Sequence, residues 1–276
     1  MRTLPSLDVD RPNDVTEGGP SSSAEDPSTV LDLFGAVCDR AAELLAANDN
    51  WSSSGVRDGQ YSIDVDIDRE CLRMLHAAGF EVLSEESGRT GVADGDEPSR
   101  VVVVDPLDGS TNAALGLPWC ATALCLVADG LPTVAMVANL RTGSRFSAVR
   151  GSGALLDGRT IRVGEVPELS SAIVAVNARP PASFRPAQYR SMGATALDIA
   201  SVAVPGGFDG SIDFDDDKIG VWDYLAAVLI VTEAGGVAID ALGRDLVTLD
   251  HAARRQPVTA GSQALLDELL VASQLA

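Results

Sequence analysis

The chain of 276 residues is short of positive charge: 20 Lys and Arg residues stand against 40 Asp and Glu residues, so its formal net charge is −20 at pH 7. A protein this acidic lacks the basic surface that binds nucleic acid or anionic lipid. We therefore expect neither a nucleic-acid partner nor a membrane partner.

Histidine and cysteine are also scarce. The two histidines, His76 and His251, are too few for a metal site built from several imidazoles. The four cysteines lack the paired spacing of a zinc site, so we expect free thiols, as in a cytoplasmic protein. Carboxylates remain as the abundant reactive groups.

Long apolar runs are missing. No stretch approaches the roughly 20 apolar residues that a membrane helix needs, and residues 1–20 lack the apolar core of a signal peptide. Residues 1–27 are rich in Pro, Ser, Gly and acidic residues and predict a flexible tail. We expect one domain over 28–276, with an N-terminal half at 28–165 and a C-terminal half at 166–276.

The hydrophobic spacing predicts both helices and strands. Helices are expected near 29–45, with Ser28 as N-cap, and near 66–78, 194–204, 222–234 and 263–270. Strands are expected at 100–104, 121–127, 133–137, 146–149, 173–176 and 237–239. This mixture indicates a layered α/β architecture.

Asp105 and Asp108 form the clearest acidic cluster. They follow a valine-rich strand that Pro106 is expected to end, and Gly109 permits a tight turn after them. Two carboxylates held together repel unless a cation or a proton lies between them, and oxygen ligands favour Mg²⁺, Mn²⁺ or Ca²⁺ over zinc. The N–H groups after Gly109 suit a phosphate. The alternative is an acidic turn that only caps a helix.

Two further acidic clusters are weaker on their own. Glu85 and Glu86 have the alternative of a solvated charged loop, and Asp223 has the alternative of a helix N-cap. Their order along the chain together with Asp105 and Asp108 is far more specific than any of them alone.

Taken together, Ser84–Ser87, Asp105–Asn112, Trp222–Ala227 and Glu233–Gly236 resemble the inositol monophosphatase family of Mg²⁺-dependent, lithium-sensitive phosphomonoesterases. The resemblance extends from about Thr29 to the C-terminus. It implies an alternating α/β/α/β/α sandwich and a homodimer. A phosphate ester is dianionic, and divalent cations would reverse the repulsion that bare carboxylates exert on it.

The resemblance also implies a set of metal ligands. A first Mg²⁺ ion would bind Glu85, Asp105 and the carbonyl of Leu107, and a second would bind Asp105, Asp108 and Asp223. A third, looser ion would contact Glu85, and Mn²⁺ is an alternative metal.

Catalytic and substrate residues follow from the same resemblance. Besides Glu85, it implies that Asp66 and the hydroxyl of Ser110 orient the attacking water, with Asp64 as the alternative to Asp66. The expected contacts of the substrate are Gly109, Ser110, Thr111, Arg190, Gly193, Ala194, Thr195 and Asp213. A structural salt bridge is the alternative for Arg190.

The substrate class stays open. The acidic insertion at 215–217 is most simply interpreted as a solvated turn. A small polyol, cyclitol, sugar or nucleoside phosphate, histidinol phosphate included, is the expected substrate. The alternatives are a phosphatase of the 3′-phosphoadenosine phosphate or fructose bisphosphate type and a catalytically silent, metal-binding regulatory protein.

Overall fold

The structure is a computed structural model. It describes residues 26–55, 60–91, 100–166, 168–215 and 218–273. Most of the predicted tail, residues 1–25, lies outside the described residues. The first helix begins at Pro27, two residues before the expected start near Thr29, and Asp26 is its N-cap.

The first helix, α1 (Pro27–Ala47), is capped by Asp26 and not by Ser28 as predicted. The Oδ1 atom of Asp26 accepts a hydrogen bond of 3.1 Å from the N–H of Ser28. Pro27 occupies the first helical turn, where its missing N–H has no intrahelical partner to lose. Ser28 therefore lies inside the helix that it was expected to cap.

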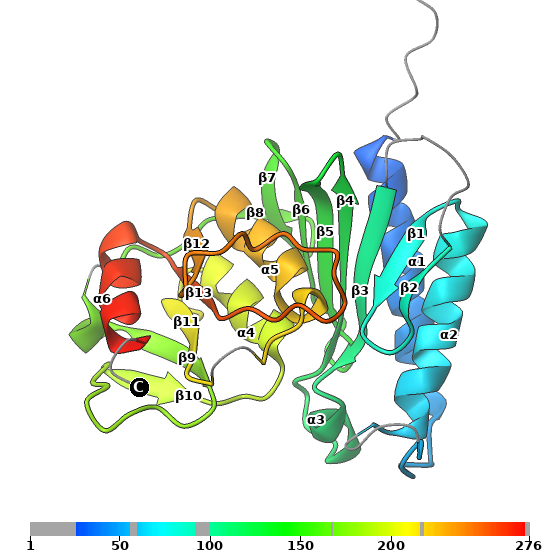
Figure 1. Ribbon diagram of the computed structural model, residues 1–276, viewed down its shortest axis with the longest axis horizontal. Coiled ribbons are helices and arrows are strands. Elements are labelled where there is room, and N and C mark those ends of the chain that lie inside the picture. Colours follow the sequence, from blue (N-terminus) through cyan, green and yellow to red (C-terminus); the bar gives the residue numbers. More distant parts are fainter. Residues whose placement is uncertain (1–25, 56–59, 92–99, 167, 216–217, 274–276) are drawn as a thin grey trace, which may run out of the picture.

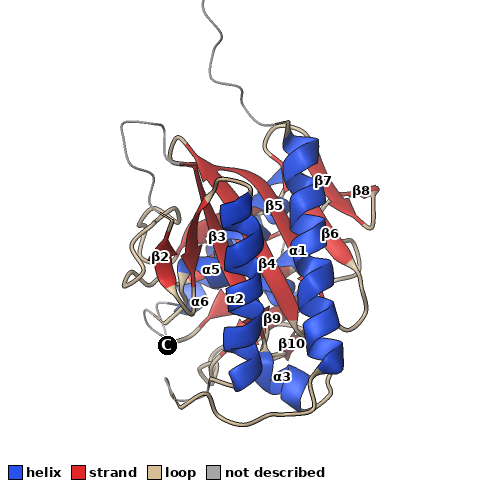
Figure 2. Ribbon diagram, turned by 90° about the vertical axis from the view of Figure 1, so that its right-hand side faces the viewer, coloured by secondary structure: helices blue, strands red, loops and turns tan. Residues whose placement is uncertain are grey.

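The second helix, α2 (Ser62–Ala77), begins four residues before the predicted Asp66. The carboxylate of Asp64 accepts a hydrogen bond of 2.8 Å from the N–H of Tyr61, which closes the first turn early. Helices α1 and α2 lie side by side on one face of a large sheet (Figure 2). Their buried apolar residues include Phe34, Val37, Ile67 and Leu75.

The large sheet has the strand order β2-β1-β3-β4-β5-β6-β7-β8. Its strands are β1 (Glu81–Ser84), β2 (Gly88–Thr90), β3 (Arg100–Asp108), β4 (Ala121–Ala128), β5 (Leu131–Asn139), β6 (Arg145–Val149), β7 (Gly153–Leu156) and β8 (Arg159–Ile161). β1 runs parallel to β3, and the other neighbours are antiparallel. Alternate valines of β3 enter different cores, Val102 below α1 and α2 and Val103 on the opposite face.

Strand β3 does not end at Pro106, contrary to the sequence prediction, but continues to Asp108. Its pairing with β4 is irregular between Asp105 and Asp108, which accommodates a proline without an N–H to donate. On the other side, β3 pairs with β1 only as far as Val104. The two parallel strands therefore separate where Asp105 begins.

The second sheet has the order β10-β9-β11-β13-β12. Its strands are β9 (Ile173–Asn177), β10 (Gln188–Arg190), β11 (Gly210–Asp213), β12 (Val237–Asp240) and β13 (Pro257–Ala260). Helix α6 (Gln263–Ser273) covers its outer face (Figure 1). The short helix α3 (Ser110–Ala114) follows β3 at one end of the large sheet.

Helices α4 (Thr195–Ala200) and α5 (Val221–Glu233) lie between the two sheets (Figure 1). α4 is shorter than predicted, since a 3₁₀ turn over Ser201–Ala203 follows it. α5 is apolar on nearly all sides, as a helix enclosed by two sheets must be. The layers are helix, sheet, helix, sheet and helix, which confirms the predicted α/β/α/β/α sandwich.

Two absences bear on the predictions. No helix in the described ranges is long and apolar enough to cross a membrane. All four cysteines fall within those ranges, are buried and form no disulfide.

Candidate metal centre

Three carboxylates from distant parts of the chain meet near the end of β1 and the start of α5. Glu85 directly follows β1, Asp105 lies in β3, and Asp223 lies in the first turn of α5. One carboxylate oxygen of each lies within 4.8 Å of one from each of the others. The parallel pairing of β1 and β3 places two of them together, because parallel strands end at the same edge of a sheet.

Backbone groups orient two of these carboxylates. The Oδ1 atom of Asp105 accepts a hydrogen bond of 3.0 Å from the N–H of Leu107, and Oδ2 of Asp223 accepts one of 2.7 Å from Gly220. The Oδ2 atom of Asp105 is buried and accepts no hydrogen bond from any described donor. A buried carboxylate oxygen without a donor fits a cation ligand.

The electrostatics also favour a cation. Burial raises the pKa of Asp105 well above its usual value, and the negative charges of Glu85, Asp108 and Asp223 raise it further. Burial raises the pKa of Asp223 in the same way, again with repulsion from Glu85 and Asp108. Positive charge between these groups would remove the repulsion, so the donor set fits a hard divalent ion.

Asp108 is held differently from the other three. Its two oxygens accept hydrogen bonds from the first turn of α4, at 3.1 Å from the N–H of Thr195 and 2.7 Å from that of Ala196. Burial raises its pKa to about 7, and these N–H groups oppose the shift. Asp108 is not among the three residues whose oxygens meet within 4.8 Å. It instead links the metal-side loop to α4.

Gly109 allows the sharp turn from β3 into α3. Its φ is +79°, and a β-carbon there would lie 2.9 Å from that of Ala194 and 3.0 Å from the carbonyl oxygen of Trp119. Only glycine fits. No described group accepts a hydrogen bond from the N–H groups of Ser110 or Thr111, which are left open at the start of α3.

The site carboxylate expected on α2 is not where the sequence placed it. The side chain of Asp66 is 53% exposed and forms an ion pair of 2.8 Å with Arg69, so the structure does not bring it to the cluster. Its alternative, Asp64, is buried in the first turn of α2, where its carboxylate accepts a hydrogen bond from the N–H of Tyr61. Asp68 is the residue that faces the site: its carboxylate accepts hydrogen bonds from the hydroxyls of Ser84 and Ser87, on either side of Glu85 and Glu86.

Comparison with known proteins assigns the fold and its acidic cluster to one family. The sequence model of the inositol monophosphatase family matches residues 52–275. An inositol-1-monophosphatase of Rhizobium meliloti (strain 1021) is 34% identical over 191 residues, which are 64% of this chain and 68% of the relative. A fructose-1,6-bisphosphatase of Pyrococcus furiosus is 31% identical over 202 residues, 72% of this chain and 77% of the relative. The chain belongs to the inositol monophosphatase family.

A solved structure agrees with this assignment. The extragenic suppressor protein SuhB from Bartonella henselae has a TM-score of 0.76 and 25% identity, over 89% of this chain and 98% of that chain. Membership confirms the resemblance and makes the chain a hydrolase of the phosphatase class. The inositol monophosphatase family is metal-dependent, in agreement with the acidic cluster described above.

The structure distributes the predicted substrate contacts unevenly. Gly193 is exposed beside α3, but Ala194 is buried against Gly109. Thr195 gives its N–H to Asp108 and accepts a hydrogen bond of 3.0 Å from Asn177 at its hydroxyl oxygen. Thr195 is thus already engaged within the protein.

Arg190 and Asp213 lie on the second sheet. Arg190 is exposed on β10, donates to the carbonyl of Tyr189 and the side chain of Gln188, and forms no ion pair within the described ranges. Asp213 is buried at the end of β11 and accepts a hydrogen bond of 2.9 Å from the N–H of Asp215. Of the insertion at 215–217, only Asp215 is described, in an ion pair of 2.8 Å with Lys218.

Sequence reasoning missed a junction beside the metal centre. The amide nitrogen of Asn112 donates to the carbonyls of Trp119, Met192 and Gly193, and the indole N–H of Trp119 donates to Asp198. The available signal was Asp198 itself, an acidic residue on the buried face of a predicted helix.

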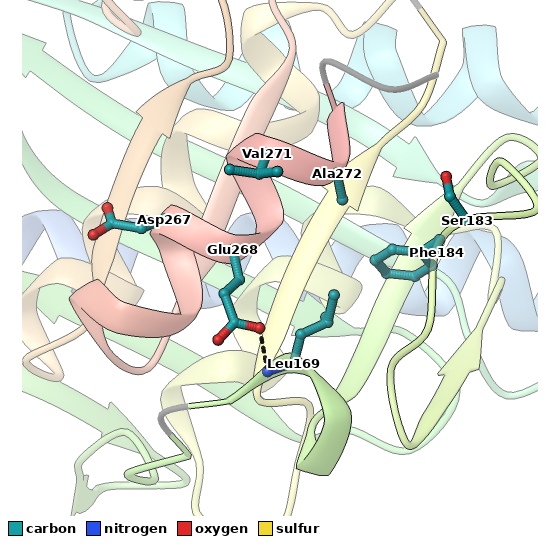
Figure 3. A pocket seen from close by; sticks show the side chains of 7 residues that line it. All are labelled: Leu169, Ser183, Phe184, Asp267, Glu268, Val271 and Ala272. Carbon is teal, nitrogen blue, oxygen red and sulfur yellow. Dashed lines mark hydrogen bonds between the residues drawn. The ribbon is translucent and has the colours of Figure 1, made fainter.

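An apolar cavity lies elsewhere. It has a volume of about 380 Å³ and opens between α6 and the segment before β10 (Figure 3). Its lining residues are Leu169, Ser183, Phe184, Asp267, Glu268, Val271 and Ala272. Its two charged side chains, Asp267 and Glu268, are acidic, so the cavity does not suit a phosphate ester.

Proposed function

We propose that the protein is a Mg²⁺-dependent phosphomonoesterase that hydrolyses a small polyol, cyclitol, sugar or nucleoside phosphate. The convergence of the Glu85, Asp105 and Asp223 carboxylates in a chain of this family is the observation that carries the proposal. Oxygen ligands, crowded negative charge and a buried oxygen without a donor all favour hard divalent ions.

The proposed ligands are those implied by the sequence. Glu85, Asp105 and the carbonyl of Leu107 would hold one Mg²⁺ ion, and Asp105, Asp108 and Asp223 would hold another, with a third near Glu85 and Mn²⁺ as a substitute. When bound, these ions supply positive charge opposite the phosphate and lower the pKa of a water molecule.

The remaining tasks belong to the chain itself. The open N–H groups of Ser110 and Thr111 would donate to phosphate oxygens, and the Ser110 hydroxyl would orient the attacking water. We assign Asp68 in place of Asp66 as the α2 carboxylate that supports this arrangement, because Asp68 alone of the two is buried against the Glu85 segment.

A metal-dependent hydrolysis assay tests the proposal. Inositol, sugar and nucleoside monophosphates would each be incubated with Mg²⁺ and with excess chelator, and released phosphate measured. We expect turnover that chelator abolishes and added Mg²⁺ restores, and inhibition by lithium. Undiminished turnover in chelator would rule the proposal out.

Fructose 1,6-bisphosphate is the second candidate substrate, since a relative that is 31% identical carries that activity in its name. The ratio of kcat/KM for fructose 1,6-bisphosphate and inositol 1-phosphate decides between them. A silent, metal-binding protein would hydrolyse neither compound and would still bind Mn²⁺ in calorimetry.

Two finer expectations complete the proposal. A homodimer is the assembly that the family resemblance favours, and the cytoplasm is the location that the free thiols favour. Light scattering coupled to gel filtration tests the assembly: a mass near 57 kDa, twice the 28.6 kDa of one chain, supports it. A mass near that of one chain contradicts it.

A further inference from the structure

Residues 241–256, which we call the strap, form the long loop that connects β12 to β13. The strap leaves the second sheet, crosses α5 and reaches the region of β3 before it returns (orange in Figure 1). It thus spans from the C-terminal half of the fold to the edge where the metal-side carboxylates gather.

Hydrogen bonds join the two ends of the strap and attach its middle to α5. The Oδ1 atom of Asp240 accepts hydrogen bonds of 2.7 Å from the N–H of Gln256 and 2.9 Å from the guanidinium of Arg244. Further along, the hydroxyl of Tyr224 on α5 donates a hydrogen bond of 2.7 Å to the carbonyl of Leu246. These contacts give the strap a fixed path over α5.

His251 of the strap contacts residues on both sides of the metal centre. Its Nε2 atom lies 3.0 Å from the carbonyl oxygen of Glu85, so this nitrogen carries the proton and donates. Its ring packs on the indole of Trp222, with centroids 4.7 Å apart and planes inclined by 31°. Glu85 directly follows β1 of the large sheet, and Trp222 immediately precedes Asp223.

Trp222 is itself fixed over the cap of α5. The guanidinium of Arg254, also on the strap, lies 5.0 Å from the centre of the indole. A β-carbon at Gly220 would come within 2.3 Å of the ring, and the N–H of Gly220 is the donor that orients Asp223. A contact on the indole therefore acts on the turn that presents Asp223.

The carboxylates of Glu85 and Asp223 repel each other and come from different layers. Two carboxylates that repel each other move apart unless other contacts hold them together. Contacts that hold them in place before a cation binds reduce the ordering that binding requires, and so make the free energy of cation binding more favourable. We propose that His251 is a positioning residue that keeps Glu85 and the first turn of α5 together and so raises the affinity for divalent cations; this inference rests on the proposed function.

Two substitutions separate the contacts of His251. His251→Phe keeps a ring against Trp222 and loses the donor to Glu85, whereas His251→Gln keeps a donor and loses the ring. Tyr224→Phe loosens the strap by removing only the hydroxyl that donates to the carbonyl of Leu246. Leu242→Ala is the matched control, because Leu242 is on the strap with 61% of its surface exposed.

Mn²⁺ binding by calorimetry and the Mg²⁺ concentration for half-maximal activity are measured for each folded variant. For His251→Phe we expect both constants to weaken by about fivefold to tenfold, with kcat at saturating Mg²⁺ largely retained. His251→Gln should recover part of this loss, Tyr224→Phe should show a smaller loss, and Leu242→Ala should match the wild type.

The inference is overturned if His251→Phe and Tyr224→Phe bind Mn²⁺ as tightly as the wild type. It is also overturned if His251→Phe lowers kcat at saturating Mg²⁺ without changing metal affinity. A wild-type protein that binds no Mn²⁺ would instead refute the proposed function, so the two failures are distinguishable.

Discussion

Asp68 on α2 accepts hydrogen bonds from the hydroxyls of Ser84 and Ser87, the two residues that bracket Glu85 and Glu86. Asp68 is only 2% exposed, and Ser84 in turn accepts a hydrogen bond of 3.2 Å from the N–H of Glu86. A chain of hydrogen bonds thus runs from a rigid helix to the segment that presents a metal-side carboxylate. Such outer partners fix the orientation of ligands.

Replacement of Asp68 tests this support. Asp68→Asn leaves one acceptor oxygen for two hydroxyl donors, so the Glu85 segment should loosen, and kcat/KM should fall by about 10-fold to 100-fold. Asp66→Asn is the matched control on the same helix and should stay within about twofold, because its exposed ion pair contributes little. Equal losses in steady-state assays of the two variants would contradict the assignment.

The phase of α2 shows why Asp66, the aspartate expected from the sequence, does not reach the acidic cluster. Residues four apart share a helix face, so Asp64 and Asp68 point the same way, whereas Asp66 points to solvent with Arg69. The true start of the helix at Ser62 depends on the cap made by Asp64. The spacing of the apolar residues Ile63, Ile67 and Cys71 indicates the buried face of the helix. The closely spaced aspartates at 64, 66 and 68 made it hard to tell from the sequence which of them lies near that face.

The rest of the site was predictable to the extent that it is local or marked by a motif. The turn at Gly109 and the acidic clusters follow from short segments of the sequence. That Glu85, Asp105 and Asp223 lie close together was predicted only from the family resemblance. The contact of Trp119 with Asp198 joins residues 79 positions apart. Such a pair depends on how α4 packs beneath the large sheet, which no local pattern records.

Asp105→Asn should stabilise the metal-free protein and at the same time weaken its binding of Mg²⁺. Asparagine keeps an acceptor for the N–H of Leu107 and removes an ionisable group whose pKa is raised by burial first and by the neighbouring carboxylates second. In chelator we expect a higher Tm than for the wild type, by about 2–4 °C for each kcal/mol of repulsion relieved. Differential scanning calorimetry should also show that the variant loses most of its Mg²⁺-induced rise in Tm. A lower Tm in chelator would show that repulsion at Asp105 is small.

Trp119→Phe should destabilise the junction beside α3. Phenylalanine retains an aromatic ring but lacks the indole N–H, which donates a hydrogen bond of 2.8 Å to Oδ1 of Asp198. The other carboxyl oxygen of Asp198, Oδ2, already has no described hydrogen-bond partner. A buried acceptor left without a donor costs about 1–3 kcal/mol. Urea unfolding at pH 7 measures this loss. Trp51→Phe is the control, since the N–H of Trp51 has no described acceptor, and an equal loss there would contradict the argument.

Asp198 should make the stability of the protein depend on pH. Burial raises its pKa from 3.8 to about 8; the hydrogen bond from Trp119 opposes this shift, and the charge of Asp108 adds to it. Between these two values the folded protein holds a proton that the unfolded chain has released. The free energy of unfolding must therefore fall as the pH rises, by about 1.4 kcal/mol per pH unit from this group.

Asp198→Asn removes that contribution and keeps an acceptor for the indole of Trp119. Its unfolding free energy, measured in urea between about pH 5 and 7, should decline less steeply than that of the wild type by about 1.4 kcal/mol per unit. Asp129→Asn, in an exposed turn where asparagine accepts the positive φ of 51°, removes the same charge and should leave the wild-type slope. Parallel profiles for the wild type and Asp198→Asn would mean that Asp198 is ionised in the folded protein, and that its carboxylate is stabilised by more than the single donor from Trp119.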